Sequence, residues 1–379
     1  MRGVWSIGDI PVHSCLLMSS AGEAIGFPRG EMQLSFCPTC GFVGNTAFDV
    51  AMNRYSGTYE ETQGFSQTFG RFAKTLAHEL VHKHDLEGRT ILEIGCGKGE
   101  FLAEMCAAGT CNGIGIDPAY RPDRRPAAAT ERIQYIQDFY DRRYAHLEAD
   151  CIVCRHTLEH IAPTFAFVSE LRATIGDRLD TVVFFELPDI LRILREGAFW
   201  DLYYEHCSYF SAGSLARLFR WCGFDIVELE RAYDDQYLLL TAVPAERATE
   251  AALLIEDDLD ELVRLVDAFP GTVEAVKGTW RQFLNSGAND PKRTVIWGSG
   301  SKGVAFLTTL GVTDEIDCVV DINPHRQGTF MAGTGHEIVS PESLADHGVD
   351  NVIVMNPIYV DEIRGTLSEM GLHPNVVAV

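Results

Sequence analysis

The feature that most constrains the fold is a short apolar run that ends in closely spaced glycines. Residues 90–94 read Thr-Ile-Leu-Glu-Ile, and Gly95-x-Gly97-x-Gly99 follows them directly. Residues 100–108 then have the composition of a helix. At the carboxyl end of a strand, glycines let the backbone turn sharply and let a ligand approach the main chain. The pattern therefore predicts an α/β fold, a doubly wound sheet with a ligand-binding loop.

Strand and helix patterns alternate beyond this loop. Further apolar runs with strand character lie at residues 112–116, 151–154, 181–185, 225–229 and 237–241. Helical stretches lie between them, such as residues 211–221, and a helix with one apolar face is expected from Ser66 onward. Alternation of this kind predicts a mostly parallel sheet with helices on both faces.

A second, smaller Rossmann-like unit is expected near the carboxyl end of the chain. Strand-like runs recur at residues 294–297, 318–321 and 351–355. The preceding stretch carries an apolar stripe among acidic residues, which predicts two connecting helices broken at Pro270-Gly271. We therefore expect a short irregular amino-terminal lobe (1–54), a large α/β domain (55–245), a helical connector (246–288) and a Rossmann-like domain (289–379).

Charge and cysteine content indicate which classes of partner and which compartment suit the chain. The chain has 31 Lys and Arg against 54 Asp and Glu, a net charge of −23. Such a surface repels nucleic acid and anionic membranes. The eleven cysteines, several of them in apolar stretches, and an amino terminus without a signal-peptide core indicate reduced thiols in a cytoplasm. A small molecule is the expected partner, and the oligomeric state stays open.

Two further features, Asp117 and residues 137–139, follow the first glycine loop at the intervals of a cofactor site. The loop is one residue shorter than the dinucleotide fingerprint, and Asp117 ends the next strand at about the 20-residue offset of a ribose-binding acid. The set resembles motif I of the class I methyltransferases, which wraps S-adenosylmethionine. The resemblance implies a cofactor site made by Glu93, Gly95, Cys96, Gly97, Gly99, Phe101, Asp117, Pro118, Asp138, Phe139, Arg155 and His156.

A polar segment follows the run at 151–154. His156, Glu159 and His160 are expected at the mouth of the sheet, where ligands bind. One interpretation is a metal site. The other, which we favour, is a polar wall of the cofactor pocket.

Aromatic and titratable residues crowd together at 199–211. Methyl transfer needs a nucleophile, usually made by a general base, and His206 suits that task. Tyr203 could relay a proton or hold an oxyanion, and Glu205 could orient the histidine. The structural alternative is an aromatic surface under the next helix, for which Ser211 is the expected cap.

Tyr203-x-Glu205-His206 resembles the Tyr-His-Glu-His signature of the sugar C-methyltransferases of deoxysugar pathways, with Tyr204 in place of the first His. That family combines a zinc-binding domain, a class I methyltransferase domain and a Rossmann-like domain. The resemblance implies methylation of the carbon next to a ketone in a nucleotide-activated sugar, through an enediolate. It implies His206 as the base, with Tyr203 and Glu205 in support. It also implies a tyrosine just before the methyltransferase domain, for which Tyr59 is the first candidate and Tyr55 the second.

In the same family the carboxyl-terminal domain helps to enclose the substrate. Lys302 and Arg326 are the candidates for neutralising its phosphates, and Tyr55 and His160 are further expected substrate contacts. By motif alone, however, Gly298-x-Gly300-x-x-Gly303 is a nicotinamide-dinucleotide site. An NAD-binding oxidoreductase or sensor is therefore one alternative. An O-methyltransferase is another, because a hydroxyl acceptor would need only deprotonation by His206.

The amino-terminal lobe departs from the family pattern. The family has two C-x-x-C pairs, whereas only Cys37 and Cys40 are clear here. His13 and Cys15 could supply the missing ligands of a structural zinc site. A degenerate, metal-free lobe is the alternative.

Overall fold

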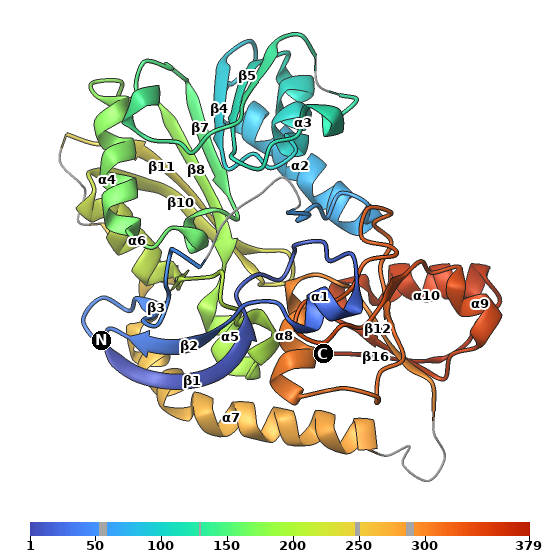
Figure 1. The fold of residues 1–379 in the computed structure, drawn as a ribbon. Coiled ribbons are helices and arrows are strands. Elements are labelled where there is room, and N and C mark those ends of the chain that lie inside the picture. Colours follow the sequence, from blue (N-terminus) through green and yellow to red (C-terminus); the bar gives the residue numbers. More distant parts are fainter. Residues whose placement is uncertain (53–58, 129, 247–250, 286–291) are drawn as a thin grey trace.

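The computed structural model describes residues 1–52, 59–128, 130–246, 251–285 and 292–379. Its strands form three sheets of seven, five and four strands. A long helix, α7 (Leu259–Asn285), packs along the four-stranded sheet and α5 (Ile190–Glu196), as Figure 1 shows. No helix in the described part of the chain combines the length and apolarity that a bilayer crossing needs.

The seven-stranded sheet contains the first glycine loop, and its order is β10-β11-β8-β7-β4-β5-β6. Its strands are β4 (Thr90–Ile94), β5 (Asn112–Ile116), β6 (Ile133–Ile136), β7 (Cys151–Arg155), β8 (Val182–Pro188), β10 (Phe224–Ala232) and β11 (Tyr237–Pro244). All neighbours pair in parallel except β11, which is antiparallel to both β8 and β10. A tight turn with positive φ at Tyr233, Asp234 and Asp235 joins β10 to β11, and so short a connection permits only antiparallel pairing. The prediction of a mostly parallel sheet is confirmed.

Helices cover both faces of this sheet because successive strand residues point to opposite sides. Ile91 packs against α2 (Gln67–Lys83) and α3 (Glu100–Gly109), whereas Leu92 packs on the side of α4 (Thr164–Ile175) and α6 (Ala212–Trp221). The predicted start of α2 is confirmed, and the Ser66 hydroxyl caps this helix by accepting a hydrogen bond from Phe69 N. Four 3-10 turns complete the domain: η1 (Pro122–Arg124), η2 (Arg142–Tyr144), η3 (Leu158–His160) and η4 (Phe199–Asp201).

The amino-terminal region is a sheet, so the expectation of an irregular lobe is wrong. Its strands are β1 (Arg2–Pro11), β2 (Arg29–Phe36), β3 (Val43–Asn45) and β9 (Ser208–Tyr209), with the short helix α1 (Ala21–Ile25) in the β1–β2 connection. Met32, Leu34 and Phe36 alternate along β2 and are fully buried. Gly, Pro and Ser residues lie within these strands as well as at the turns between them, and they obscure this period-two pattern in the sequence. The fourth strand comes from the aromatic segment, and Val43 pairs with Tyr209.

The carboxyl-terminal sheet is wholly parallel, in the order β14-β13-β12-β15-β16, as expected of a Rossmann-like unit. Its elements are β12 (Thr294–Trp297), α8 (Ser301–Leu310), β13 (Val319–Val320), β14 (Ile338–Val339), α9 (Ser343–His347), β15 (Asn351–Val354), η6 (Pro357–Tyr359), α10 (Val360–Glu369) and β16 (Asn375–Ala378).

The connector contains η5 (Leu254–Glu256) and one continuous helix, so the predicted break at Pro270-Gly271 is wrong. A proline inside a helix costs roughly 3 kcal/mol. Here Leu262, Val266, Phe269 and Val273 stay buried at helical spacing on both sides of Pro270. Each buried aliphatic or aromatic side chain contributes about 1.5–3 kcal/mol, which offsets that cost.

Candidate active site

One cavity of about 1020 Å³ lies where the three sheets meet. The predicted site residues that line it are Tyr59, Glu93, Gly95, Cys96, Gly97, Phe101, Asp117, Pro118, Phe139, Arg155, His156, His160, Tyr203, His206, Lys302 and Arg326, together with Cys15. The predicted residues outside its lining are Gly99, Asp138, Glu205, His13, Cys37 and Cys40. Tyr55 lies outside the described residues. The cavity thus joins the predicted donor and acceptor ends.

The donor end is shaped by the first glycine loop. Gly95, Gly97 and Gly99 have φ values of 72°, 54° and 84°, a region that side chains rarely adopt. A Cβ at Gly95 would lie 2.0 Å from the Thr157 hydroxyl. The Asp117 carboxylate accepts hydrogen bonds from Gly97 N at 2.9 Å and Ala119 N at 2.6 Å. The loop is therefore tied to the end of β5.

Two buried carboxyl groups give the donor end its electrostatic character. Burial raises the pKa of Glu93 to about 8 and that of Asp117 to about 6. Glu93 accepts a hydrogen bond from Leu102 N at 3.0 Å, which anchors the first turn of α3. An adenosyl sulfonium fits this end, because its ribose hydroxyls would donate to Asp117 and its positive charge would favour the ionised form of the nearby Glu93.

Arg155 and His156 line the wall between the two ends. The Arg155 guanidinium lies 3.8 Å from the centroid of the Phe101 ring and pairs with Glu186. Glu186 also bonds to His156 Nε2 at 3.0 Å. Burial would lower the pKa of His156, but Glu186 and Glu159 outweigh it and raise that pKa to about 9. His156 therefore carries a positive charge at neutral pH.

Asp138 is the predicted cofactor residue that faces elsewhere. Its carboxylate accepts from the Tyr144 hydroxyl at 2.7 Å and from Phe139 N at 2.8 Å, and it pairs with Arg143. These local partners turn the carboxylate away from the cavity, whereas Phe139 lines it.

The acceptor end is built around His206. Its ring centroid lies 4.2 Å from that of Tyr203 and 4.7 Å from that of His160. His206 N donates to Tyr203 O at 3.1 Å, which closes a turn that brings the two side chains together. This turn begins two residues after η4, in the aromatic segment that leads into β9.

Glu205 does not orient His206, contrary to the sequence prediction. The tight turn sends its carboxylate the other way, to His13 Nδ1 at 2.9 Å and to the amide and hydroxyl of Ser14. Only the main-chain oxygen of Glu205 serves the site, where it accepts from His160 Nδ1 at 3.1 Å. Glu205 therefore anchors the turn to the β1–α1 connection.

Burial sets the charge states at the acceptor end. It lowers the pKa of His206 well below the usual range, and the nearby His160, His156 and Lys302 side chains lower it further. Burial and then the Asp201 carboxylate raise the pKa of Tyr203 well above its usual range. The imidazole is thus a neutral proton acceptor beside a neutral phenol donor.

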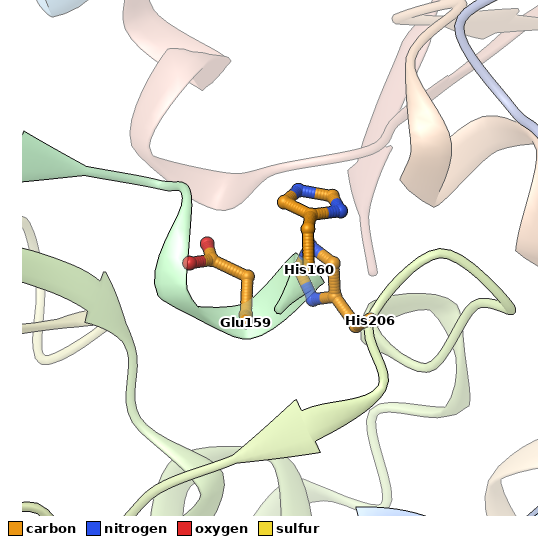
Figure 2. Close-up of side chains that lie close together, drawn as sticks. All are labelled: Glu159, His160 and His206. Atoms are coloured by element: carbon orange, nitrogen blue, oxygen red, sulfur yellow. The ribbon is translucent and has the colours of Figure 1, made fainter. Parts of the chain in front are cut away.

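Glu159, His160 and His206 could together hold a metal ion. Figure 2 shows them converging, and one ligand atom from each lies within 4.8 Å of the others. Glu159 is buried, and its Oε2 has no hydrogen-bond partner among the described residues. The trio differs from the one considered from the sequence, because His156 turns to Glu186 instead. However, the positive charges of His156 and Lys302 that lower the pKa of His206 would also repel a divalent cation.

The two predicted phosphate-binding cations already have partners. Lys302 Nζ lies 2.6 Å from Asp201 Oδ1, and burial lowers the pKa of this amine. Arg326 donates to Ser299 O at 2.9 Å and to Glu60 O. Both line the cavity, but each already bonds to another group of the protein.

The predicted zinc ligands do not come together. Cys37 and Cys40 lie at the β2–β3 turn, where the Cys40 amide lowers the pKa of the Cys37 thiol. His13 pairs with Glu205, and Cys15 Sγ lies 3.5 Å from Arg326 Nη2. Across the described ranges, the one group of three or more metal-ligating side chains is the trio above. The predicted four-ligand site is therefore wrong.

Two family models match the chain one after the other. A methyltransferase domain model matches residues 65–229, and a C-methyltransferase C-terminal domain model matches residues 242–373. The chain belongs to the C-methyltransferases. It is an S-adenosylmethionine-dependent methyltransferase.

A curated relative agrees with this assignment. The C-methyltransferase NovU of Streptomyces niveus is 27% identical over 295 residues, which cover 73% of this chain and 68% of that protein. Among solved structures, a Burkholderia thailandensis 1,6-didemethyltoxoflavin-N1-methyltransferase with bound S-adenosylhomocysteine is 19% identical and covers 46% of this chain and 79% of its own, with a TM-score of 0.37. The magnesium protoporphyrin IX methyltransferase of Synechocystis is 15% identical over 47% and 84% of the two chains, also with a TM-score of 0.37. Scores this low add no weight to the assignment.

The second glycine loop lies inside the C-methyltransferase C-terminal domain match. That match leaves the dinucleotide-binding alternative without support. Asp321 accepts from Ser299 N at 3.0 Å and Asn323 N at 2.8 Å, so this loop too is tied to its neighbouring strand.

Several cavity residues escaped the sequence prediction: Glu61, Lys98, Arg192, Asp201 and Asn323. Lys98 carried a signal, because it is a charged residue between two glycines of the donor loop. The other residues depend on contacts between distant segments.

Proposed function

We propose that this C-methyltransferase methylates the carbon next to a ketone in a nucleotide-activated sugar or a related biosynthetic intermediate. The observation that carries the proposal is the neutral His206 imidazole, packed against the neutral Tyr203 phenol in a cavity that continues to the donor loop. A base and a hydrogen-bond donor so placed suit the removal of a proton next to a carbonyl group.

In the proposed reaction, His206 takes the proton from the carbon, and the C–H electron pair moves toward the carbonyl oxygen. The Tyr203 phenol donates a hydrogen bond to that oxygen, and the positive charges of His156 and Lys302 stabilise the enediolate. The negative charge beside His206 raises its pKa during this step, so a base that is weak in the free enzyme becomes stronger. Bound S-adenosylmethionine would supply the methyl group. As the enediolate carbon forms the new C–C bond, the methyl–sulfur bond would break and its electron pair would leave with S-adenosylhomocysteine.

The carboxyl-terminal sheet offers room for the rest of the acceptor. Ser301 and Lys302 begin α8 and line the cavity. A helix amino terminus attracts anions, and Lys302 would exchange part of its contact with Asp201 for a phosphate oxygen. These features support a substrate whose ketone lies at His206 and whose phosphates reach α8.

Deuterium exchange separates carbon from oxygen methylation. In D₂O without methyl donor, we expect deuterium to enter a nucleotide-linked 4-keto sugar at the carbon next to the ketone, as followed by NMR. An enzyme that transfers methyl groups to this acceptor but catalyses no exchange would point to an oxygen acceptor instead.

His206→Ala tests the base. We expect methyl transfer to fall about 10²–10⁴-fold, the usual contribution of a general base, while S-adenosylhomocysteine affinity stays within twofold. Mass detection of the product and calorimetry check the two quantities. His146→Ala removes an exposed histidine as a matched control. Full activity in His206→Ala would remove this residue from the mechanism.

A further inference from the structure

Residues 59–61, here called the strap, cross the cavity at the point where the three sheets meet. Tyr59 forms a bridge with Leu16, and Glu60 N donates to Cys15 O at 2.9 Å. The Glu60 carboxylate accepts from Arg124 at 2.9 Å and from Asn323 at 2.9 Å. The strap is thus held by the amino-terminal region, the donor domain and the carboxyl-terminal sheet together.

Lys98 is the contact between the strap and the donor loop. Its side chain is only 1% exposed, and its ammonium group donates to Tyr59 O at 2.7 Å and to the Glu61 carboxylate at 2.8 and 3.1 Å. Its side-chain hydrogen bonds to the described residues therefore all go to the strap. A Cβ at Gly97 would lie 2.7 Å from Glu61 Oε1, so the strap lies directly over the loop.

Tyr59 and the donor loop are therefore connected directly through Lys98. Lys98 lies between Gly97 and Gly99, whose backbone shapes the donor end. Its amine donates a hydrogen bond to the carbonyl oxygen of Tyr59. Tyr59 lines the cavity, and its ring meets the His13 ring edge-on with 6.2 Å between the two centroids. A change in the loop on donor binding would move Lys98, and Lys98 would move Tyr59.

We propose that Lys98 is a positioning residue that couples donor binding to the placement of Tyr59 at the acceptor. The coupling rests on the proposed function, since it assumes that Tyr59 serves the acceptor step. Through the Lys98–Glu61 ion pair, a bound donor orders the strap, so proton removal is fastest when the methyl donor is present. By linkage, a bound acceptor tightens donor binding by the same factor.

The test is the deuterium exchange reaction with and without S-adenosylhomocysteine, which occupies the donor end but carries no methyl group. In the unaltered enzyme we expect S-adenosylhomocysteine to speed exchange by about fivefold or more, within the usual range of coupling between sites. In Lys98→Met, at an S-adenosylhomocysteine concentration that calorimetry shows to saturate the variant, we expect this stimulation to disappear. Lys74→Met, at an exposed position of α2, is the matched control and keeps the stimulation.

A double-mutant cycle separates positioning from general damage. If Lys98 acts through Tyr59, Lys98→Met slows methyl transfer in the unaltered chain but has less than about a twofold effect in a Tyr59→Phe background. Glu61→Gln removes the same ion pair from the other side and behaves like Lys98→Met, which covers the case in which Lys98→Met fails to fold.

Additive effects of Lys98→Met and Tyr59→Phe, or no stimulation by S-adenosylhomocysteine in the unaltered enzyme, would overturn the coupling. A fully active Tyr59→Phe would overturn it as well. None of these results would touch the proposed carbon methylation, which depends on basal exchange and on His206.

Discussion

The two glycine loops of this enzyme have the same local design and different surroundings. Each follows a parallel strand and is tied to the next strand by an aspartate, Asp117 in the first loop and Asp321 in the second. Around the first loop, buried carboxyl groups with raised pKa values face the cavity. Around the second, Arg326 bonds to the loop carbonyl of Ser299. The charged groups around such a loop, and not its glycines, therefore determine which ligand it binds.

The lysines of the two loops show the same difference. Lys98 is deeply buried, Lys302 is partly buried, and both are paired with carboxylates. Lys98 holds the strap, whereas Lys302 holds Asp201 at the end of η4, two residues before Tyr203. One lysine thus serves the donor loop, and the other steadies the segment that carries the proposed base.

The largest expected contrast is between the two aspartates. Asp117→Ala removes the acceptor for the donor ribose, and we expect S-adenosylhomocysteine affinity to fall about 100-fold, or ~2.7 kcal/mol. Asp321→Ala should leave that affinity within twofold. Calorimetric titration measures both. Equal losses would mean that the two loops do not divide the ligands between them.

Next is the backbone of the second loop. A Cβ at Gly303 would lie 2.5 Å from Gly298 O, so Gly303→Ala should lower the free energy of unfolding by about 2 kcal/mol. Gly300→Ala is the matched control, because its Cβ meets no atom closer than 4.0 Å and its φ is −72°. Chemical unfolding compares them. Equal stability would show that α8 can shift away from the loop.

The third test is the lysine of the second loop. Lys302→Met should raise the KM for the nucleotide-linked acceptor about tenfold, since one charge-assisted hydrogen bond to phosphate is lost. Donor affinity should not change. If KM stays constant and only the melting temperature falls, Lys302 serves the Asp201 pair alone.

The smallest expected effect is on pH dependence. The pKa of Asp117 is raised to about 6 in the free protein, and a donor ribose binds best to the ionised carboxylate. Affinity should therefore fall below pH 6 and be about tenfold lower at pH 5 than at pH 7. Asp117→Asn should flatten this profile at a lower affinity. An unchanged slope in that variant would assign the titration to another group.

Much of the fold could be predicted because local patterns determine it. Three predicted strands, 90–94, 112–116 and 294–297, have the bounds of β4, β5 and β12. The amino-terminal sheet was missed, although Met32, Leu34 and Phe36 carried its period-two pattern. Its pairing of β3 with β9 joins residues 43 and 209, and no local signal reports a contact so distant in sequence.

Most of the predicted site residues line one cavity, but the contacts that they make could not be predicted from the sequence. The donor loop and Asp117 could be identified in the sequence because their spacing follows from the fold. The direction of Glu205 was not, since it depends on the turn at Tyr203 and on His13 far along the chain. Likewise, the sequence identifies Lys302 and Arg326 as cationic side chains, but it does not predict the groups to which they bond.

The pairing of β3 with β9 has a consequence for how such an enzyme can be recombined. β9 begins two residues after His206, so the hydrogen bonds of Val43 with Tyr209 fix the backbone that carries the proposed base. A chimera that exchanged the first 45 residues with those of a relative would also exchange the support of its own proton acceptor. The amino-terminal segment and the turn at 203–206 should therefore be inherited together, as one block that crosses the boundaries between the sheets.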